Sequence, residues 1–165
     1  MTGTPIPAPM RWALTEAEAA AALGEVPVGA VLVDGAGRLL AAAGNRVEEA
    51  RDPLAHAEML VLQTATRLLG AKHLSGCDLW VTLEPCAMCA AAIVHARVRR
   101  LYFAAFDPKG GAVEHGPQLY RQPTIQHRPE VYGGIAERQA ADLLRGFFRA
   151  RRQTGRCIPT DPTDG

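Results

Sequence analysis

Apolar residues in this chain recur first with the period of a helix and then with that of strands. Residues 10–23 are rich in Ala and predict a helix, and Gly24 stands where a C-terminal cap belongs. The apolar positions of this helix include Met10, Leu14, Ala17 and Ala21. Two apolar runs follow, 28–33 and 38–43, and the Asp-Gly-Ala-Gly stretch between them predicts a β-hairpin.

After the hairpin, helical and strand patterns alternate along the chain. We expect helices over residues 55–69, 86–97 and 135–152, and strands over residues 78–83, 99–105 and 130–132. The last helix should turn four apolar side chains inward, namely Leu143, Leu144, Phe147 and Phe148. Residues 45–53 and 107–129 are predicted loops, and the second has a length that is often functional.

Strands that alternate with helices after an opening hairpin predict an α/β fold: a three-layer α/β/α domain on a five-stranded mixed sheet. Residues 1–152 should form this domain, since 165 residues suffice for one core. Residues 153–165 are polar with two Pro and are expected to be a disordered tail. No apolar run approaches the roughly 18 residues of a membrane span, and residues 1–9 lack a secretory pattern, so we expect a cytoplasmic protein without membrane contact.

The charge is nearly balanced overall but unevenly distributed. The net charge is +1, which by itself indicates neither nucleic acid nor an acidic partner. Between Gly134 and Arg156, however, six Arg stand against two acidic residues, while the first 50 residues carry three Arg and six acids. This asymmetry favours an anionic partner near the C-terminus.

Four cysteines narrow the chemistry. Cys77 and Cys157 are isolated, and a lone Cys usually behaves as a small hydrophobic residue. Cys86 and Cys89 form a Cys-x-x-Cys pair directly after Pro85. In a chain without an export signal, such a pair indicates metal or redox chemistry rather than a structural disulfide.

A second motif, His56-Ala57-Glu58, completes a metal site with this pair. Residues three apart on a helix share one face, so Cys86 and Cys89 can hold one ion together with His56. One His and two thiolates leave the fourth position of a tetrahedral zinc open, which is typical of a catalytic site. Glu58 is too close to His56 in sequence to ligate the same ion and is better placed as a proton shuttle.

Two other interpretations of the cysteine pair were weighed. A thioredoxin-like redox pair would not need the His-x-Glu motif upstream. A structural zinc site would need a fourth ligand, and neither His73 nor His95 stands at finger spacing. The combination of His-x-Glu, a strand, and Pro-Cys-x-x-Cys therefore favours a catalytic zinc, one per chain.

Several motifs together give the chain a clear resemblance. It resembles the cytidine and nucleotide deaminase superfamily, and within it the bacterial tRNA-specific adenosine deaminases, over roughly residues 11–152. The similar segments are Glu25–Val31, Gly44–Arg46, Asp52–Glu58, Val81–Cys89, His127–Val131 and Phe147–Arg152. The resemblance implies a cytidine-deaminase-like fold, a homodimer, and deamination of the wobble adenosine in a tRNA anticodon loop to inosine.

The same resemblance assigns roles to further residues. Glu58 would protonate the base and then the leaving amine. Asn45 and the backbone N–H of Ala57 would hold the base edge, and the backbone carbonyl of Glu84 would accept from the amine. Asp107 would line the RNA groove or cap its own loop. Three arginines would bind RNA, or would only form a solvated helix end: Arg149, Arg151 and Arg152.

Two departures from the family pattern affect the substrate rather than the zinc chemistry. Gly44 replaces the aromatic residue that usually precedes the Asn, and Glu114–Pro117 replaces the usual Gly-Ser-Leu of the long loop. A deaminase of a free base or nucleoside, such as guanine or cytosine, therefore stays open as an alternative. A non-catalytic subunit of a heterodimeric deaminase is a further alternative, but such subunits often lose the acid found here at Glu58.

Overall fold

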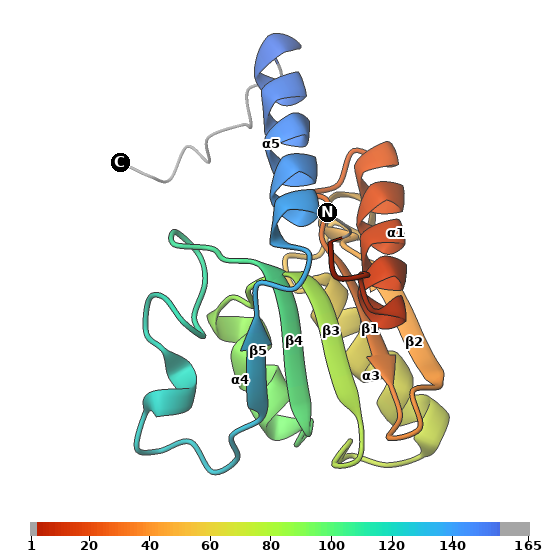
Figure 1. Ribbon diagram of the computed structural model, residues 1–165, viewed down its shortest axis with the longest axis vertical. Coiled ribbons are helices and arrows are strands. Elements are labelled where there is room, and N and C mark those ends of the chain that lie inside the picture. The colour runs from red at the N-terminus through yellow and green to blue at the C-terminus, as the bar shows by residue number, and fades with distance from the viewer. Residues whose placement is uncertain (1–2, 156–165) are drawn as a thin grey trace.

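The computed structural model describes residues 3–155, which fold around one five-stranded sheet in the order β2-β1-β3-β4-β5 (Figure 1). The strands are β1 (Gly29–Val33), β2 (Leu39–Gly44), β3 (Asp78–Leu83), β4 (Arg100–Ala105) and β5 (Glu130–Gly133). β1 pairs antiparallel with β2 and β3, whereas β3 with β4 and β4 with β5 are parallel. The predicted mixed sheet is confirmed.

Helices lie on both faces of this sheet. They are α1 (Ala8–Ala22), α2 (Val47–Ala50), α3 (Ala57–Leu69), α4 (Ala87–His95) and α5 (Glu137–Gln153), with one 3₁₀ turn, η1 (Leu119–Arg121). Helices α3 and α4 cover one face, while α1 and the start of α5 lie on the other (Figure 1). The three-layer prediction is confirmed. In the described part of the chain, no helix is long and apolar enough to cross a membrane.

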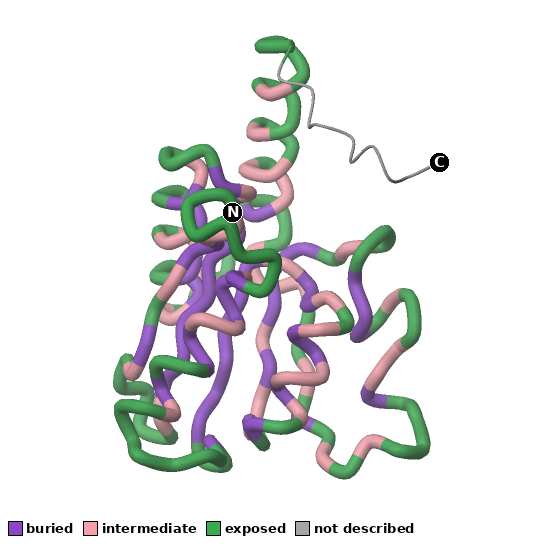
Figure 2. The backbone as a smooth tube through the Cα atoms, turned by 180° about the vertical axis from the view of Figure 1, so that it is seen from behind, coloured by how far each residue is buried: buried purple, intermediate pink, exposed green. Residues whose placement is uncertain are grey.

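Alternation along the strands divides the core between these two faces. Leu79 and Val81 on β3 pack toward α3 and α4, whereas Trp80 between them packs toward α1 and α5. In Figure 2 the central strands are accordingly almost continuously buried. Side chains of successive strand residues point to opposite faces, which explains why these runs are apolar throughout.

Two cross-strand glycines let α1 lie directly on the sheet. Gly29 and Gly44 are paired in register between β1 and β2. A Cβ at Gly29 would lie 2.0 Å from the backbone oxygen of Ala13, and one at Gly44 would lie 2.7 Å from that of Glu16. Any side chain would push α1 away. The glycine that departs from the family pattern before Asn45 is thus explained by helix packing.

Helix α2 lies inside residues 45–53, where the sequence predicts only a loop. The buried carboxylate of Glu25 accepts hydrogen bonds from the backbone N–H groups of Glu48 (3.2 Å) and Glu49 (2.8 Å). An acceptor at a helix N-terminus satisfies donors that have no partner within the helix. The prediction was wrong because this cap comes from another part of the chain and four residues show no periodicity.

Helix α5 departs from its prediction in how it packs. It begins at Glu137, two residues later than predicted, and continues beyond the end of the sheet (Figures 1 and 2). Of the predicted inward residues, three are half-buried, while Phe148 is 40% exposed. The later turns have no sheet beneath them. Gln153 closes α5 rather than opening a tail, and residues 156–165 of the predicted tail lie outside the described residues.

Candidate metal centre and substrate cavity

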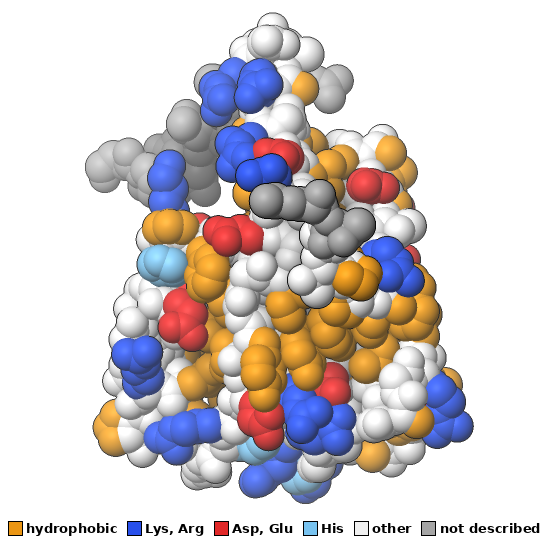
Figure 3. Space-filling model, in the orientation of Figure 1, with side chains coloured by type: hydrophobic (Ala, Val, Ile, Leu, Met, Phe, Trp, Pro, Cys, Tyr) orange, Lys and Arg blue, Asp and Glu red, His pale blue; other side chains and the backbone are white. Residues whose placement is uncertain are grey.

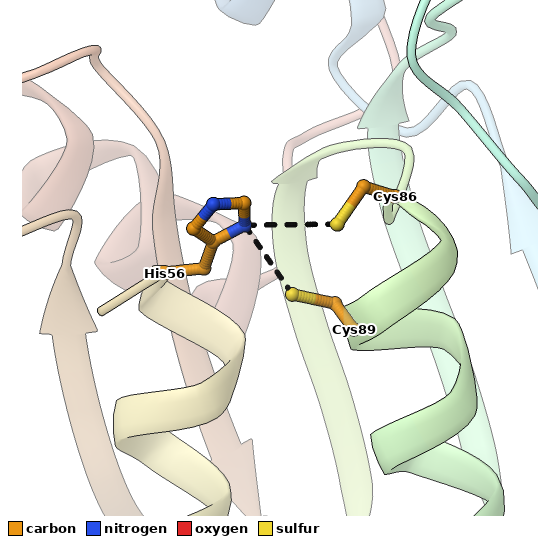
Figure 4. Close-up of side chains that lie close together, drawn as sticks. All are labelled: His56, Cys86 and Cys89. Carbon is orange, nitrogen blue, oxygen red and sulfur yellow. Dashed lines mark hydrogen bonds between the residues drawn. The ribbon is translucent and has the colours of Figure 1, made fainter. Parts of the chain in front are cut away.

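Two helix N-termini bring the predicted metal ligands together. His56 is the N-cap residue of α3, Cys86 is the N-cap residue of α4, and Cys89 lies in the first turn of α4 (Figure 4). The two helices lie side by side on the same face of the sheet, so the ligands converge. The positive ends of the two helix dipoles favour the thiolate form that metal binding requires.

The spacing of the three side chains fits a tetrahedral metal ion. The Nδ1 atom of His56 lies 3.7 Å from the sulfur of Cys86 and 3.5 Å from the sulfur of Cys89 (Figure 4). Zinc–nitrogen and zinc–sulfur bonds at a tetrahedral angle would place such atoms about 3.6 Å apart. Among residues 3–155, no fourth His, Cys or acidic side chain belongs to this group. The fourth protein ligand that a structural zinc site needs is therefore not supplied by the described residues.

The two thiols share their protons unequally. The pKa of Cys86 is lowered to about 4, because the Cys89 thiol, and then His56, donate hydrogen bonds to its thiolate. The pKa of Cys89 is raised, because its thiol donates to Cys86 and is buried. One thiolate is therefore already stabilised. Binding of a cation would release the remaining proton, as thiolate coordination requires.

Glu58 lies beside the ligands without being one of them. It sits on the first turn of α3, is 4% exposed and lines the same cavity as His56 and Cys86. Burial is the main reason that its pKa is raised to about 7. A carboxyl group that titrates near neutral pH can both accept and donate a proton, as a general acid–base catalyst must.

A cavity of about 310 Å³ opens at these groups and is called the metal-side cavity here. Its volume lies in the range of small-ligand sites, about 300–1,000 Å³. Its wall includes Val28, Asn45, His56, Glu58, Cys86 and Asp107. All of these except Val28 were candidates from the sequence.

Asn45 and Ala57 are joined to each other in this wall. The backbone N–H of Ala57 donates to Oδ1 of Asn45 at 2.9 Å. This amide was expected to hold the base, but it already has a partner in the structure. The hydrogen bond orients the Asn45 side chain, because it fixes which end of the amide faces α3, and it leaves the Nδ2 donor for a ligand.

The side chain of Glu84 has a role that sequence reasoning missed. Its buried carboxylate accepts hydrogen bonds from the backbone N–H groups of Asp107 (2.9 Å), Val113 (3.2 Å), Glu114 (2.8 Å) and His115 (3.0 Å). Burial alone would raise its pKa, but these donors and the His115 ring outweigh burial, and the pKa is lowered. The sequence feature that could have indicated this role is an acidic residue placed directly between an apolar strand and Pro85. The expected role of the Glu84 backbone carbonyl, as acceptor for the leaving amine, concerns a different group of this residue and stays a prediction.

Asp107 is placed at the junction of two cavities. Its Oδ1 atom accepts from the backbone N–H groups of Lys109 (3.1 Å) and Gly110 (3.0 Å), which makes it the cap of its own turn. It also lines the metal-side cavity and a second cavity of about 790 Å³ beside it. The capping expected from the sequence is observed, and a role of Asp107 in lining an RNA groove stays a prediction.

The second cavity is lined by cations and aromatic rings and is called the cationic groove here. Its basic lining residues are Lys109, Arg145, Arg149 and Arg152, beside the rings of Phe106 and Phe148 and the carboxylate of Asp107. It shares four lining residues with the metal-side cavity, namely Val26, Leu83, Asp107 and Gly110. Figure 3 shows Lys and Arg side chains gathered along α5.

The three arginines that the sequence suggested as RNA ligands do not all line the same cavity. Arg149 and Arg152 line the cationic groove, whereas Arg151 lies in a different hollow. The guanidinium of Arg151 lies 5.1 Å from the ring centre of Phe147. Lys109 and Arg145, which were not singled out from the sequence, also line the cationic groove. The helical period explains the split, because Arg149 and Arg152 are three residues apart and share a face.

Comparisons with known proteins agree with this geometry. The sequence profile of the cytidine and deoxycytidylate deaminase zinc-binding region matches residues 6–105. The chain belongs to this deaminase family, which is the class of protein that the fold and the ligand triad define.

Members of the deaminase family differ in how similar they are to this chain. A tRNA-specific adenosine deaminase of Agrobacterium fabrum is 55% identical over 143 residues, which cover 87% of this chain and 93% of the relative. A solved structure from a study of A-to-I editing by deaminases at the wobble position of transfer RNA is 54% identical, with a TM-score of 0.81, covering 82% of this chain and 98% of the other. A guanine deaminase from Nitrosomonas europaea is 26% identical, with a TM-score of 0.74 and coverage of 88% and 86%.

Proposed function

We propose that this chain is a zinc-dependent hydrolase that converts adenosine to inosine at the wobble position of a tRNA anticodon, with an arginine tRNA as the expected substrate. One observation carries the proposal. The metal-side cavity, with Glu58 in its wall, adjoins a groove lined by four cations and two aromatic rings. A free base needs only the first cavity, whereas a polynucleotide needs both. The identity to tRNA-specific adenosine deaminases supports the same substrate.

One zinc ion per chain would be held by His56, Cys86 and Cys89, whose donor atoms and spacing fit it. When bound, zinc supplies Lewis-acid chemistry that makes water a nucleophile at neutral pH. Glu58 accepts a proton from the attacking water and delivers it to N1 of the adenine ring. The same carboxyl group then takes the proton of the hydroxyl now attached to C6 and passes it to the amine, which leaves as ammonia, so that the C6 carbonyl of inosine remains.

The base is held by groups that line the metal-side cavity. The Nδ2 of Asn45 donates to an acceptor on the base edge, because its Oδ1 is occupied by Ala57. The backbone carbonyl of Glu84 accepts from the leaving amine, and Asp107 borders the opening toward the groove. The N–H of Ala57, which the family resemblance assigned to the base edge, orients Asn45 instead, because it donates to Oδ1 of that side chain.

The flanking nucleotides lie in the cationic groove. Arg149 and Arg152 neutralise phosphates there, assisted by Lys109 and Arg145. The rings of Phe106 and Phe148 offer faces on which unpaired bases stack. A target adenosine must be unstacked to enter the metal-side cavity, and a single-stranded loop makes this unstacking easiest.

Three wider inferences accompany this function. Residues 1–152 act as one deaminase domain, and the chain works as a homodimer, as the family resemblance implies. A tRNA substrate places the enzyme in the cytoplasm.

Incubation of the zinc-loaded protein with total tRNA, followed by sequencing for A-to-I changes, tests the proposal. The expected result is inosine at a wobble position, with no change at adenosines held in stems. Unmodified tRNA after prolonged incubation with protein that carries its full equivalent of zinc would overturn the assignment.

A further inference from the structure

One buried carboxylate holds the segment that separates the two cavities. The side chain of Glu84 is 0% exposed, and the residue lies between the end of β3 at Leu83 and Pro85. Its oxygens accept from four backbone N–H groups spread over residues 107–115, as described above. A loop that passes around a single acceptor in this way has its backbone fixed at both ends.

His115 adds a side-chain contact to the same carboxylate. Its Nδ1 lies 2.9 Å from Oε2 of Glu84. Because an ionised carboxylate can only accept, Nδ1 must carry the proton and donate it. The His115 ring also meets the ring of Phe106 edge-on, with 6.1 Å between the centroids. His115 therefore touches both Glu84 and an aromatic wall of the cationic groove.

Close contact elsewhere in the loop confirms how tightly it surrounds Glu84. A Cβ at Gly111 would lie 2.5 Å from Cδ of Glu84 and 2.5 Å from the backbone oxygen of Asp107. Only glycine fits at this position. The four residues that replace the family's usual loop sequence begin at Glu114, so two of the donors to Glu84, Glu114 and His115, belong to the altered stretch.

We propose that His115 is a positioning residue: acting through Glu84 and Phe106, it sets the wall between the two cavities and hence the affinity for nucleotides that flank the target base. This inference rests on the proposed function. Asp107 and Gly110, which line both cavities, belong to this loop. Loss of the His115 contact shifts the groove rather than the metal ligands, so substrate binding weakens while the chemical step is kept.

A matched pair of variants separates the contact from the bulk of the side chain. In His115→Asn, the Nδ2 group can occupy the place of the imidazole Nδ1 and still donate to Glu84. In His115→Leu, a side chain of similar size has no donor. The His115 side chain is 36% exposed, so neither change opens a hole in the core. Zinc content of both proteins should match the wild type, and His115→Asn should also keep the wild-type melting temperature.

Hydrogen exchange measures the positioning directly, without a substrate. In His115→Leu, the amides of Asp107 and Glu114 should exchange at least about tenfold faster, because a hydrogen bond to a charged group has been lost. In His115→Asn they should exchange like the wild type. Equal exchange in all three proteins overturns the proposal.

Kinetics on an anticodon stem-loop provide the second measurement. We expect His115→Leu to raise KM about tenfold with kcat within about twofold of the wild type, and His115→Asn to restore KM. Raised KM in both variants with unchanged exchange rates would make His115 a direct RNA contact, which also contradicts positioning. If the wild-type protein leaves the stem-loop untouched, the proposed function fails, but the exchange comparison still decides the role of His115.

Discussion

The metal-side cavity and the cationic groove adjoin each other, yet they are built in different ways. The first is made of buried and half-buried side chains at the N-termini of α3 and α4, and Asn45 in its wall is held by a hydrogen bond from Ala57. The second lies on an exposed face of α5, whose later turns extend beyond the sheet. Reacting groups must be held in place before the substrate arrives, whereas phosphate contacts tolerate mobile, solvated cations. Substitutions should therefore act on chemistry in one cavity and on binding in the other.

The largest effect is expected from removing a metal ligand. Cys89→Ala should lose its zinc, lose activity to background, and melt at a lower temperature than the wild type, because metal binding is linked to folding. Elemental analysis and thermal melting measure these effects. Cys77→Ala is the matched control, since Cys77 is also buried but lies outside the ligand group. An active, metal-free wild-type protein would contradict the whole scheme.

Glu58→Gln comes next, because it should remove the proton shuttle and nothing else. Positioned acid–base catalysis accelerates a reaction by roughly 10²- to 10⁴-fold, so the single-turnover rate should fall by roughly this factor or more. Zinc content and RNA binding should stay at wild-type values. Loss of zinc in this variant would make Glu58 a ligand and would overturn its assignment.

In the cationic groove, the expected effect is smaller and depends on salt. Replacing both Arg149 and Arg152 with Ala should reduce the slope of log affinity against log salt by about 1.4, at roughly 0.7 per phosphate contact with single strands. Arg151→Ala is the control. It removes the same kind of charge from the same helix, but Arg151 lies outside the cationic groove. Binding titrations of a stem-loop at several salt concentrations measure the slopes. Equal slopes for the double variant and the wild type would remove these arginines from the RNA site.

The smallest effect concerns stability against pH. The pKa of Glu84 is lowered in the folded protein, where its N–H donors outweigh burial, from an ordinary value near 4.5. Such a group stabilises the fold fully above its unfolded pKa, and this contribution is lost as the pH falls through the folded pKa. The free energy of unfolding of the wild type should thus fall more steeply than that of Glu84→Gln below about pH 5. Denaturant unfolding of both zinc-loaded proteins measures this, and parallel curves would contradict it.

The sequence was informative where local pattern decides the structure. The convergence of His56, Cys86 and Cys89 was predicted because their spacing and the helix starts beside Pro are local features. The bounds of the long helices were predicted to within a few residues. The roles of these side chains as ligands and of Glu58 as proton shuttle stay predictions. Helix α2 and the hydrogen bonds to Glu84 were not predicted, because their partners lie 23 or more residues away in the chain. The exposure of Phe148 depends on where the sheet ends beneath α5, which no periodicity reveals.

The central claim is that the two cavities together make a deaminase of RNA rather than of a free base. The most direct measurement offers the zinc-loaded protein an anticodon stem-loop with adenosine at the wobble position, beside free adenosine, guanine and cytosine. The account predicts inosine at the wobble position and negligible turnover of the free compounds, because these lack the binding energy of the flanking nucleotides. Rapid turnover of guanine or another free base, with the stem-loop left unchanged, would contradict the account.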